Sequence, residues 1–211
     1  TAGPTREAID PVRFIGNRSS GRMGFALAAA AWRRGADVMV VAGPVPLPVP
    51  YGVDVINVET AREMLDCVSE HLPGADVSVF AAAVADYRPA DPSEQKLKRA
   101  DAGSDMALTF TENPDVALET RALRKTGSIS VGFALETQSL MENAQAKLES
   151  KGFDVIVANE PEAEGAGFEV ETNRVLLLGA DVKAEELPLL PKDEVAEVIL
   201  DRVSEIMESG E

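Results

Sequence analysis

The chain has little of what several protein classes require. Its 211 residues hold a single cysteine, Cys67, and a single histidine, His71. One cysteine cannot form an intrachain disulfide, and these two side chains lack the further ligands that a zinc site needs. Their spacing of four residues places both on one face of an expected helix, and no neighbouring base activates the thiol. We interpret both residues as structural.

Long apolar runs are missing as well. The apolar runs at residues 25–32 and 77–84 are far shorter than the ~20 residues of a membrane-spanning helix. The first residues also lack the pattern of a signal peptide. We therefore expect a cytoplasmic protein without a membrane partner. A single domain over residues 1–211 is predicted, because this length and an apolar content of 45% suit one core.

Positive charge is scarce and unevenly distributed. The net charge is −16, yet residues 1–34 hold six arginines against two acids, whereas residues 153–211 hold sixteen acids against four bases. An acidic surface repels nucleic acid, so we expect no nucleic-acid partner and confine anion binding to the basic part. Acidity together with thirteen Arg and only seven Lys also suggests the hypothesis of a halophilic protein.

The most informative stretch is the basic one at residues 5–24. Its glycines and serines precede an alanine-rich segment with helical character. Ser19 or Ser20 is expected to cap that helix, whose free N–H groups and dipole favour a phosphate in front of them. The alternative is an ordinary glycine-permitted turn before a core helix.

The stretch is not a Walker A motif. Gly16 and Gly21 have the P-loop spacing, but Arg22 and Met23 stand where the motif needs lysine and then serine or threonine. The lysine and the metal-binding hydroxyl are thus absent. We keep phosphate binding and reject the P-loop.

Apolar runs rich in Val and Ile alternate with helical segments. Strands are expected at residues 37–42, 53–58, 77–83, 129–133 and 155–158, and helices at residues 24–34, 61–72, 116–125 and 140–151. This order predicts an α/β fold, a Rossmann-like three-layer sandwich with a mostly parallel sheet. Binding sites in such folds gather at the carboxyl ends of the strands.

Three intervals interrupt the alternation. Residues 43–50 carry proline at every second position and are interpreted as a stiff structural connector. Residues 86–104 contain the cationic tract Lys96 to Arg99 without clear periodicity, which favours a flexible strap that acts as a lid. A surface loop is expected at residues 159–173. A hydrophobic strand at 175–178, in an antiparallel edge hairpin, and a last helix at 193–207 are expected after it.

Seven motifs, in one order, resemble the phosphopantothenate-cysteine ligase family. They are TREAIDPVR (5–13), NRSSGRMG (17–24), AAAVADYRP (81–89), KLK (96–98), NPD (113–115), GFALET (132–137) and AN (158–159), and they cover nearly the whole chain. In many bacteria and archaea this family is fused behind an N-terminal flavin-dependent decarboxylase in a coenzyme A biosynthetic protein. A fusion junction upstream would explain why the chain opens on the loop-like TAGP, after or within an expected first strand.

The resemblance implies a two-step ligation. The carboxylate of 4'-phosphopantothenate attacks the α-phosphate of CTP and forms an acyl-cytidylate and pyrophosphate. The amine of L-cysteine then displaces CMP and forms the amide. Mg²⁺, lysines and helix N–H groups would neutralise the charge of the first step. The resemblance also implies a homodimer in which each strap contributes to the partner's site, whereas the choice of CTP over ATP or UTP and the Mg²⁺ ligands stay open.

The resemblance assigns roles to individual residues. Asn17 is placed at the acyl centre, where its amide would donate to the oxyanion of the second step, and Lys96 would reach over the triphosphate. Arg13 and Arg18, with Asn17, are expected at the phosphopantothenate. The expected nucleotide-binding residues are Ser19, Gly21, Ala82, Ala83, Asp86, Lys96, Asn113, Pro114, Asp115, Val116, Phe133, Lys147 and Lys151.

Without the resemblance, each of these residues has an ordinary structural interpretation. Asn17 is then a turn residue, Lys96 a solvated lysine and Phe133 part of the core. The rival functions are a nucleotide-cofactor oxidoreductase and a nucleotide-binding module without chemistry. The oxidoreductase is disfavoured because there is no Gly-x-Gly-x-x-Gly, and because the expected second strand ends in Val41-Ala42-Gly43-Pro44 without an acid for a ribose.

Overall fold

The computed structural model describes residues 1–98, 105–135, 139–159, 170–179 and 182–209. Its largest sheet has five strands in the order β12-β11-β9-β8-β5. Strands β5, β8 and β9 are parallel, and β11 runs antiparallel to both β9 and β12. The bounds are Val77–Phe80 for β5, Ile129–Leu135 for β8, Val155–Asn159 for β9, Val175–Gly179 for β11 and Val182–Glu186 for β12.

A second parallel pair lies beyond β5. It consists of β3 (Met39–Ala42) and β4 (Asp54–Asn57). The start of the chain runs between the two sheets, where Ala2 makes a parallel bridge to Ala42 and Pro4 makes one to Ala83. The pairs β3–β4, β5–β8 and β8–β9 are therefore all parallel, which confirms the prediction of a mostly parallel sheet.

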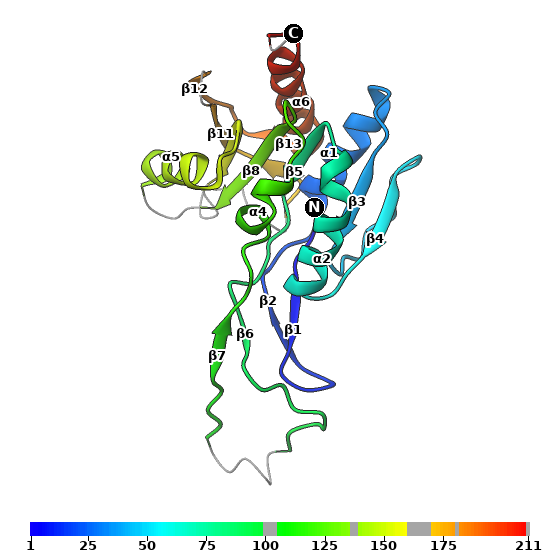
Figure 1. The fold of residues 1–211 in the computed structure, drawn as a ribbon, viewed down its shortest axis with the longest axis vertical. Coiled ribbons are helices and arrows are strands. Elements are labelled where there is room, and N and C mark those ends of the chain that lie inside the picture. Colours follow the sequence, from blue (N-terminus) through cyan, green and yellow to red (C-terminus); the bar gives the residue numbers. More distant parts are fainter. Residues whose placement is uncertain (99–104, 136–138, 160–169, 180–181, 210–211) are drawn as a thin grey trace.

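Helices cover both faces (Figure 1). Helices α1 (Arg22–Arg33) and α6 (Lys192–Ser209) share one apolar cluster with the sheet, and α4 (Val116–Glu119) and α5 (Leu140–Lys151) share another. Helix α2 (Ala61–His71) packs with α4 against β3. Strand β9 shows the two-sided burial, because Val155 and Val157 belong to the first cluster and Ile156 and Ala158 to the second. The three-layer prediction is confirmed.

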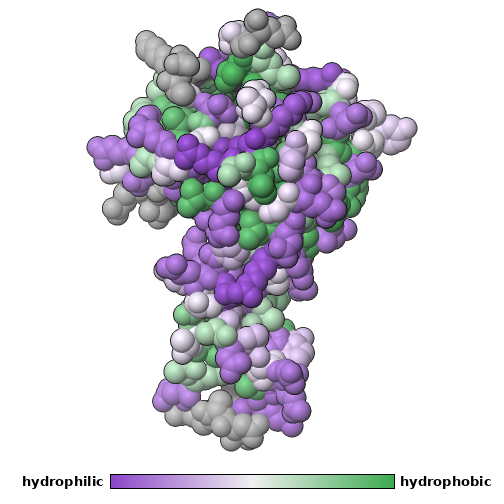
Figure 2. All heavy atoms as spheres, in the orientation of Figure 1, coloured by the Kyte–Doolittle hydropathy of each residue, from purple (hydrophilic) through white to green (hydrophobic). Residues whose placement is uncertain are grey.

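Two short hairpin-like pairs project from this body and are called the arm (Figure 1). Strand β1 (Arg6–Ala8) pairs with β2 (Phe14–Gly16), and β6 (Tyr87–Pro89) pairs with β7 (Phe110–Glu112), both antiparallel. The sequence analysis treated residues 5–24 as loop and residues 86–104 as aperiodic, so it missed both pairs. Figure 2 shows apolar and hydrophilic residues mixed on the surface of the arm.

The prediction that Ser19 or Ser20 caps α1 is wrong. The residue at the N-cap is Gly21, at φ 74°, and no side chain caps the helix from that position. The Ser19 hydroxyl instead accepts from the Gly21 N–H at 3.4 Å. Glycine is needed because φ is positive and because a Cβ at this position would lie 2.6 Å from Cγ1 of Val45.

The helix expected at residues 116–125 is shorter than predicted. Helix α4 ends at Glu119 and a 3₁₀ turn, η2 (Arg121–Leu123), follows. Thr120 is fully buried, and its hydroxyl donates to the Val116 carbonyl at 2.6 Å. At Arg124 the backbone is already extended, with ψ 135°, so the α-helix cannot continue.

The C-terminal part follows the sequence interpretation. Strand β11 forms the expected antiparallel hairpin with β12, and this hairpin lies at the edge of the five-stranded sheet, with β12 outermost. The small pair β10 (Thr172–Asn173) and β13 (Leu190–Pro191) precedes α6, and the 3₁₀ turn η1 (Leu72–Gly74) follows α2. Arg99, most of the loop expected at 159–173 and the end of the motif at 132–137 lie outside the described residues.

None of the helices in the described ranges is long and apolar enough to cross a membrane.

Candidate active site

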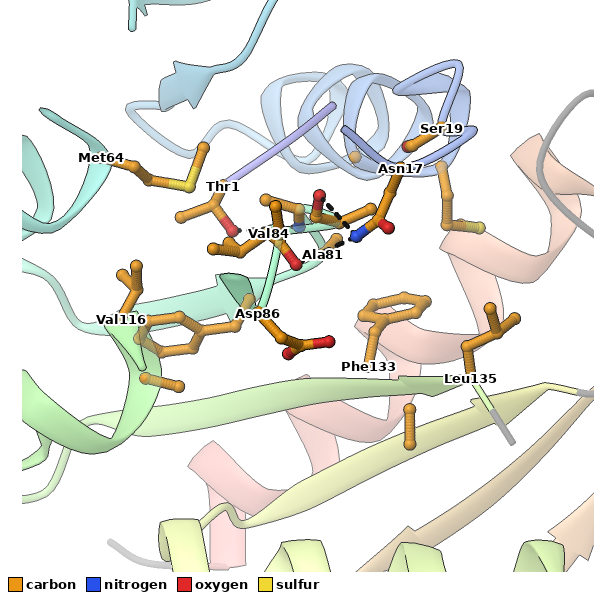
Figure 3. A pocket seen from close by; sticks show the side chains of 18 of the residues that line it. Thr1, Asn17, Ser19, Met64, Ala81, Val84, Asp86, Val116, Phe133 and Leu135 are labelled. Carbon is orange, nitrogen blue, oxygen red and sulfur yellow. Dashed lines mark hydrogen bonds between the residues drawn. The ribbon is translucent and has the colours of Figure 1, made fainter. Parts of the chain in front are cut away.

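A cavity of about 800 Å³ opens at the carboxyl ends of β5 and β8 (Figure 3). Its wall is formed by the residues after β2, the first turn of α1, the loop after β5, the loop before α4 and one side of α5. This is where a parallel α/β sheet places its binding sites. The cavity gathers all of the predicted site residues except Arg13, Arg18 and Lys96.

Asn17 is held by the loop that follows β5. Its Nδ2 donates to the carbonyls of Ala83 at 3.2 Å and Val84 at 3.0 Å, as Figure 3 shows. Only the nitrogen can donate to two carbonyls, so Oδ1 must point away from them. In this arrangement the amide joins β2 to the β5 loop, and an oxyanion would have to replace one of these two carbonyls as its acceptor.

Backbone N–H groups of the same loop already have partners. Ala82 N–H donates to the Thr1 hydroxyl at 3.1 Å, and Ala85 N–H donates to the Thr5 hydroxyl at 2.9 Å. Ala83 N–H donates to the Gly3 carbonyl at 2.9 Å. These contacts attach the loop after β5 to the first residues of the chain. They also show that these three N–H groups are not an oxyanion hole.

The first turn of α1 borders the cavity. Residues 20–24 all line it, and the first turn of α1 holds no acidic side chain. The helix comes close to the start of the chain, because a Cβ on Gly24 would lie 2.6 Å from the Cβ of Ala2. Unpaired N–H groups at a helix start carry partial positive charge. With the guanidinium of Arg22, this end of the cavity favours an anion.

Asn113 fastens the loop before α4. Its Nδ2 donates to the Ala85 carbonyl and its backbone N–H donates to the Asp86 carbonyl, both at 2.8 Å. Arg88 Nη1 donates to Oδ1 of Asn113 at 3.1 Å. Asn113 therefore holds two walls of the cavity together, a structural task that the motif did not reveal.

Asp115 opens α4, as the sequence predicted. Its Oδ1 accepts from the Leu118 N–H at 3.1 Å, which is a helix N-cap contact. Its Oδ2 lies 2.8 Å from Nζ of Lys151, so this carboxylate also orients a lysine of α5. Lys147, one turn earlier on α5, lines the cavity too.

Phe133 satisfies both interpretations that the sequence left open. Its half-buried ring packs against the apolar cluster of α1 and α6, and it also faces the cavity opposite Asp86 (Figure 3). The neighbouring Gly132 has no room for a side chain, because its Cβ would lie 2.3 Å from Cε2 of Phe153. That ring packs in turn near Phe80, with a centroid separation of 5.7 Å.

Three polar residues of the cavity wall were not among the predicted site residues, namely Asn159, which belongs to the AN motif, Asn173 and Lys192. Each is at least nine-tenths buried. Nζ of Lys192 donates to the Val170 carbonyl at 2.7 Å. Burial, helped by nearby Arg22, lowers the pKa of Lys192. For Lys192, the sequence offered only a lysine at the start of an acidic helix, directly after Pro191.

The three predicted residues outside the cavity belong to the arm and its base. Arg18 is exposed in the loop after β2. Arg13 is bonded to Asp10 and to the Leu97 carbonyl, and Lys96 is exposed beside Leu97. The two described lysines of the cationic tract, Lys96 and Lys98, therefore do not line the cavity of their own chain.

Cys67 is not activated by its surroundings. Burial, and then the nearby Glu70, raise the pKa of its thiol. No group of three or more His, Cys, Asp or Glu side chains in the described ranges could hold a metal ion by itself. Among the described residues, the acidic side chains that line the cavity belong to Asp86, Glu112 and Asp115.

Comparisons with known proteins agree with this geometry. Residues 1–207 match the family described as DNA/pantothenate metabolism flavoprotein C-terminal domain. The coenzyme A biosynthesis bifunctional protein CoaBC of Vibrio vulnificus (strain CMCP6) is 45% identical over 207 residues, which are 98% of this chain and 51% of that protein. The chain thus spans about half the length of the curated relatives it matches.

Solved structures show the same fold. The crystal structure of the C-terminal domain of CoaBC superposes with a TM-score of 0.82 at 37% identity, and covers 99% of this chain and 93% of that one. A Cab2 mutant in complex with phosphopantothenate-cysteine has a TM-score of 0.75 at 17% identity, over 99% of this chain and 85% of that one. By the extent of the family match and the identity to its relatives, the chain belongs to the DNA/pantothenate metabolism flavoprotein C-terminal domain family.

Proposed function

We propose that this chain is a phosphopantothenate-cysteine ligase of coenzyme A biosynthesis, which activates 4'-phosphopantothenate with CTP and joins it to L-cysteine. The observation that carries the proposal is the cavity at the ends of β5 and β8, which brings together the α1 start, Asn17, Asp86, Phe133 and the lysines of α5. The names of the CoaBC relatives and of the Cab2 complex support it.

The nucleotide would occupy the space between α1 and α5. The α1 start and Arg22 offer N–H groups and positive charge to phosphates at one side, and Lys147 and Lys151 offer ammonium groups at the other. The ring of Phe133 presents an apolar surface between them to a base. Because Asp115 orients Lys151, the ammonium of that lysine is positioned before any ligand binds.

Mg²⁺ belongs to the proposal and fits the site. Mg²⁺ on a triphosphate usually takes one or two protein carboxylates beside phosphate oxygens and water, and Asp86 offers its carboxylate to the same cavity. The ion would neutralise phosphate charge during the attack. The chain's own contribution is to hold the triphosphate at the α1 start and to exclude water around it.

Asn17 is the residue that we propose for amide formation. Its Oδ1 points away from the carbonyls of Ala83 and Val84 and can accept an N–H from the cysteine amine. Its Nδ2 can donate to the oxyanion if one of its two bonds to those carbonyls is exchanged. Both roles belong to the second step, after pyrophosphate has left.

Lys96 would act from a partner subunit. It is exposed on the arm and does not line the cavity of its own chain. The arm also exposes Val12, Phe14, Tyr87 and Phe110, each at least 44% accessible, which favours association with a second copy. We therefore propose a homodimer with exchanged straps, and in the longer protein an N-terminal flavin-dependent decarboxylase. Arg13 and Arg18 would bind phosphopantothenate in that dimer.

The test is pyrophosphate release by the purified chain with CTP, 4'-phosphopantothenate and L-cysteine. We expect release that needs phosphopantothenate, an acyl-cytidylate when cysteine is omitted, and the amide product when it is added. Parallel reactions with ATP and UTP test the nucleotide choice. An oxidoreductase or a binding module predicts no pyrophosphate in any of these reactions, and that result would overturn the proposal.

A further inference from the structure

The turn between β1 and β2 is built around a buried carboxylate. The side chain of Asp10 is 0% exposed. Its Oδ1 accepts from the backbone N–H groups of Val12 and Arg13, both at 2.8 Å. Two further turn bonds run from Ile9 N–H and Asp10 N–H to the Arg13 carbonyl, at 2.8 and 3.2 Å. Asp10 thus fixes the shape of the turn that leads into β2.

The other oxygen of Asp10 reaches a distant segment. Its Oδ2 accepts from the Leu97 N–H at 3.1 Å, across 87 positions in sequence, and from Nε of Arg13 at 3.0 Å. Nη2 of Arg13 then donates to the Leu97 carbonyl at 2.8 Å. Both backbone polar groups of Leu97 are therefore bound by the β1–β2 turn, and we call this set of bonds the Asp10 latch.

A third contact supports the latch. The Ser93 N–H donates to the Ile9 carbonyl at 2.9 Å, so the chain from residue 93 to residue 97 is attached to the turn at both ends. Between these points Ser93 closes a local turn, because its hydroxyl donates to the Gln95 carbonyl at 2.6 Å. The path of the backbone is thus defined as far as the cationic tract.

The latch lies between the two lysines of the described tract. Lys96 and Lys98 flank Leu97 and are exposed, so a backbone that is held at the residue between them carries both side chains. The same hairpin leads through β2 to Asn17 at the cavity. The guanidinium of Arg13 holds the pKa of Asp10 well below its usual range, so the latch carboxylate is ionised at neutral pH.

We propose that Asp10 is a positioning residue for the strap lysine, because its carboxylate, together with Arg13, fastens Leu97 to the β1–β2 turn and so sets the place from which Lys96 reaches the triphosphate. Asp10 is buried and lies outside the cavity, so it acts through other residues. The proposal rests on the proposed function for its kinetic consequence, whereas the latch itself can be measured without any activity.

The main variant is Asp10→Asn, which keeps the size but replaces one acceptor oxygen with a donor that faces N–H groups. The matched control is Glu7→Gln. Glu7 is a second buried carboxylate of the same hairpin, 3% exposed, and its Oε1 accepts from the Ala61 N–H at 2.9 Å. It anchors the hairpin to α2 and has no contact with Leu97 among the described hydrogen bonds.

Two half-reactions are measured in each variant. We expect Asp10→Asn to slow pyrophosphate release without cysteine by about 10- to 100-fold, since misplacing a reacting group by ~1 Å can cost ~100-fold. Amide formation from supplied acyl-cytidylate should fall clearly less than the first step, because the charge of Lys96 serves only the first step whereas Arg13 serves both. Glu7→Gln should lower the melting temperature and leave both half-reactions within about threefold.

Hydrogen exchange of the Leu97 amide reports the latch directly. We expect faster exchange in Asp10→Asn and unchanged exchange in Glu7→Gln. If Asp10→Asn fails to fold, Leu97→Pro removes the N–H on the strap side, keeps the turn bonds of Asp10 and should give the same kinetic change. Unchanged Leu97 exchange, equal loss in both half-reactions, or the same loss in Glu7→Gln would overturn the proposal. A wild-type chain without turnover but with the expected exchange pattern would instead refute the proposed function alone.

Discussion

The body and the arm of this molecule are stabilised in different ways. In the body, Val131, Val157 and Ile199 are completely buried, and helices cover both faces of the sheet. On the arm, Phe14 is 50% and Tyr87 54% exposed. The arm and its base also bury polar side chains, since Thr5, Glu7 and Asp10 are each at most 3% exposed and accept from backbone N–H groups.

This difference separates two sources of specificity. Apolar burial is non-directional, so the body tolerates changes that keep volume and pattern. Buried polar groups are directional, and leaving one donor or acceptor without its partner costs about 1–3 kcal/mol. The arm can therefore be redirected by one substitution that changes little volume, whereas the body is sensitive mainly to lost volume.

The largest expected effect concerns Asn17, where the arm meets the cavity. Asn17→Asp would direct a carboxylate at the carbonyls of Ala83 and Val84 and remove the Nδ2 donor. We expect amide formation to fall by ~10²- to 10³-fold, the usual loss for one such donor, while the acyl-cytidylate accumulates in a mass-spectrometric assay.

Lys96→Gln is the counterpart for Asn17→Asp, because it should slow formation of the acyl-cytidylate and spare amide formation. If Asn17→Asp abolishes pyrophosphate release without cysteine and Lys96→Gln leaves it untouched, the two assignments are reversed.

The second prediction compares truncations in the two regions. Ile199→Ala removes a completely buried side chain from the cluster of α1 and α6 and should cost about 2–5 kcal/mol of unfolding free energy. Phe14→Ala removes an exposed ring whose described partner is the Arg6 guanidinium, 4.6 Å from its centroid. We expect that change to cost under about 1 kcal/mol in the monomer, by urea unfolding.

The arm variant has a second measurement that sharpens the contrast. If two copies associate through the arm, Phe14→Ala should weaken self-association in sedimentation equilibrium although it hardly changes the monomer. Equal self-association in wild type and Phe14→Ala would argue against the arm as the dimer surface.

The third prediction concerns acid. Because the pKa of Asp10 is lower when folded than when unfolded, its ionised form stabilises the fold at pH values above ~4, the unfolded pKa, and this contribution fades as pH falls further. The stability difference between wild type and Asp10→Asn should thus be largest near neutral pH and shrink below pH ~4. A difference that stays constant between pH 7 and pH 3 would contradict the contribution of charge.

The smallest expected effect is that of salt on the body. Residues 153–211 hold sixteen acids and only four bases, so the excess negative charges repel one another. KCl screens this repulsion. We expect the melting temperature to rise between ~0.1 and ~2 M KCl, over which the screening length falls from about 10 Å to under 3 Å. A flat or falling melting temperature would argue against the halophilic hypothesis.

The sequence predicted the body well because periodicity reports burial. Strand β9 and helix α5 were found within a residue of their observed bounds. The helix expected at 116–125 was overextended because Thr120 and Arg124 end it through contacts that periodicity does not carry. The arm was missed because its strands have three residues each and its buried acids bond to groups as far as 87 positions away.

The cavity was predicted in part, by motifs at the ends of strands. Asp86, Asp115 and Phe133 lie where the motifs placed them. Asn173 and Lys192 escaped because they come from β10 and α6, beyond the parallel strands, where no motif marks them. The serine cap failed because a cap motif cannot report that Val45 crowds the turn and requires glycine at position 21.

The close contact between Gly132 and Phe153 determines the order in which these two positions can be substituted during evolution. Any side chain at position 132 would collide with the ring of Phe153, whose centroid also lies 5.2 Å from the half-buried Arg124 guanidinium. A substitution at 132 is therefore harmful while Phe153 is present and becomes tolerable only after a smaller residue has replaced it. The reverse path is open, because shrinking Phe153 first leaves a cavity and no clash. Relatives with a side chain at 132 are thus expected to carry a small residue at 153, acquired earlier.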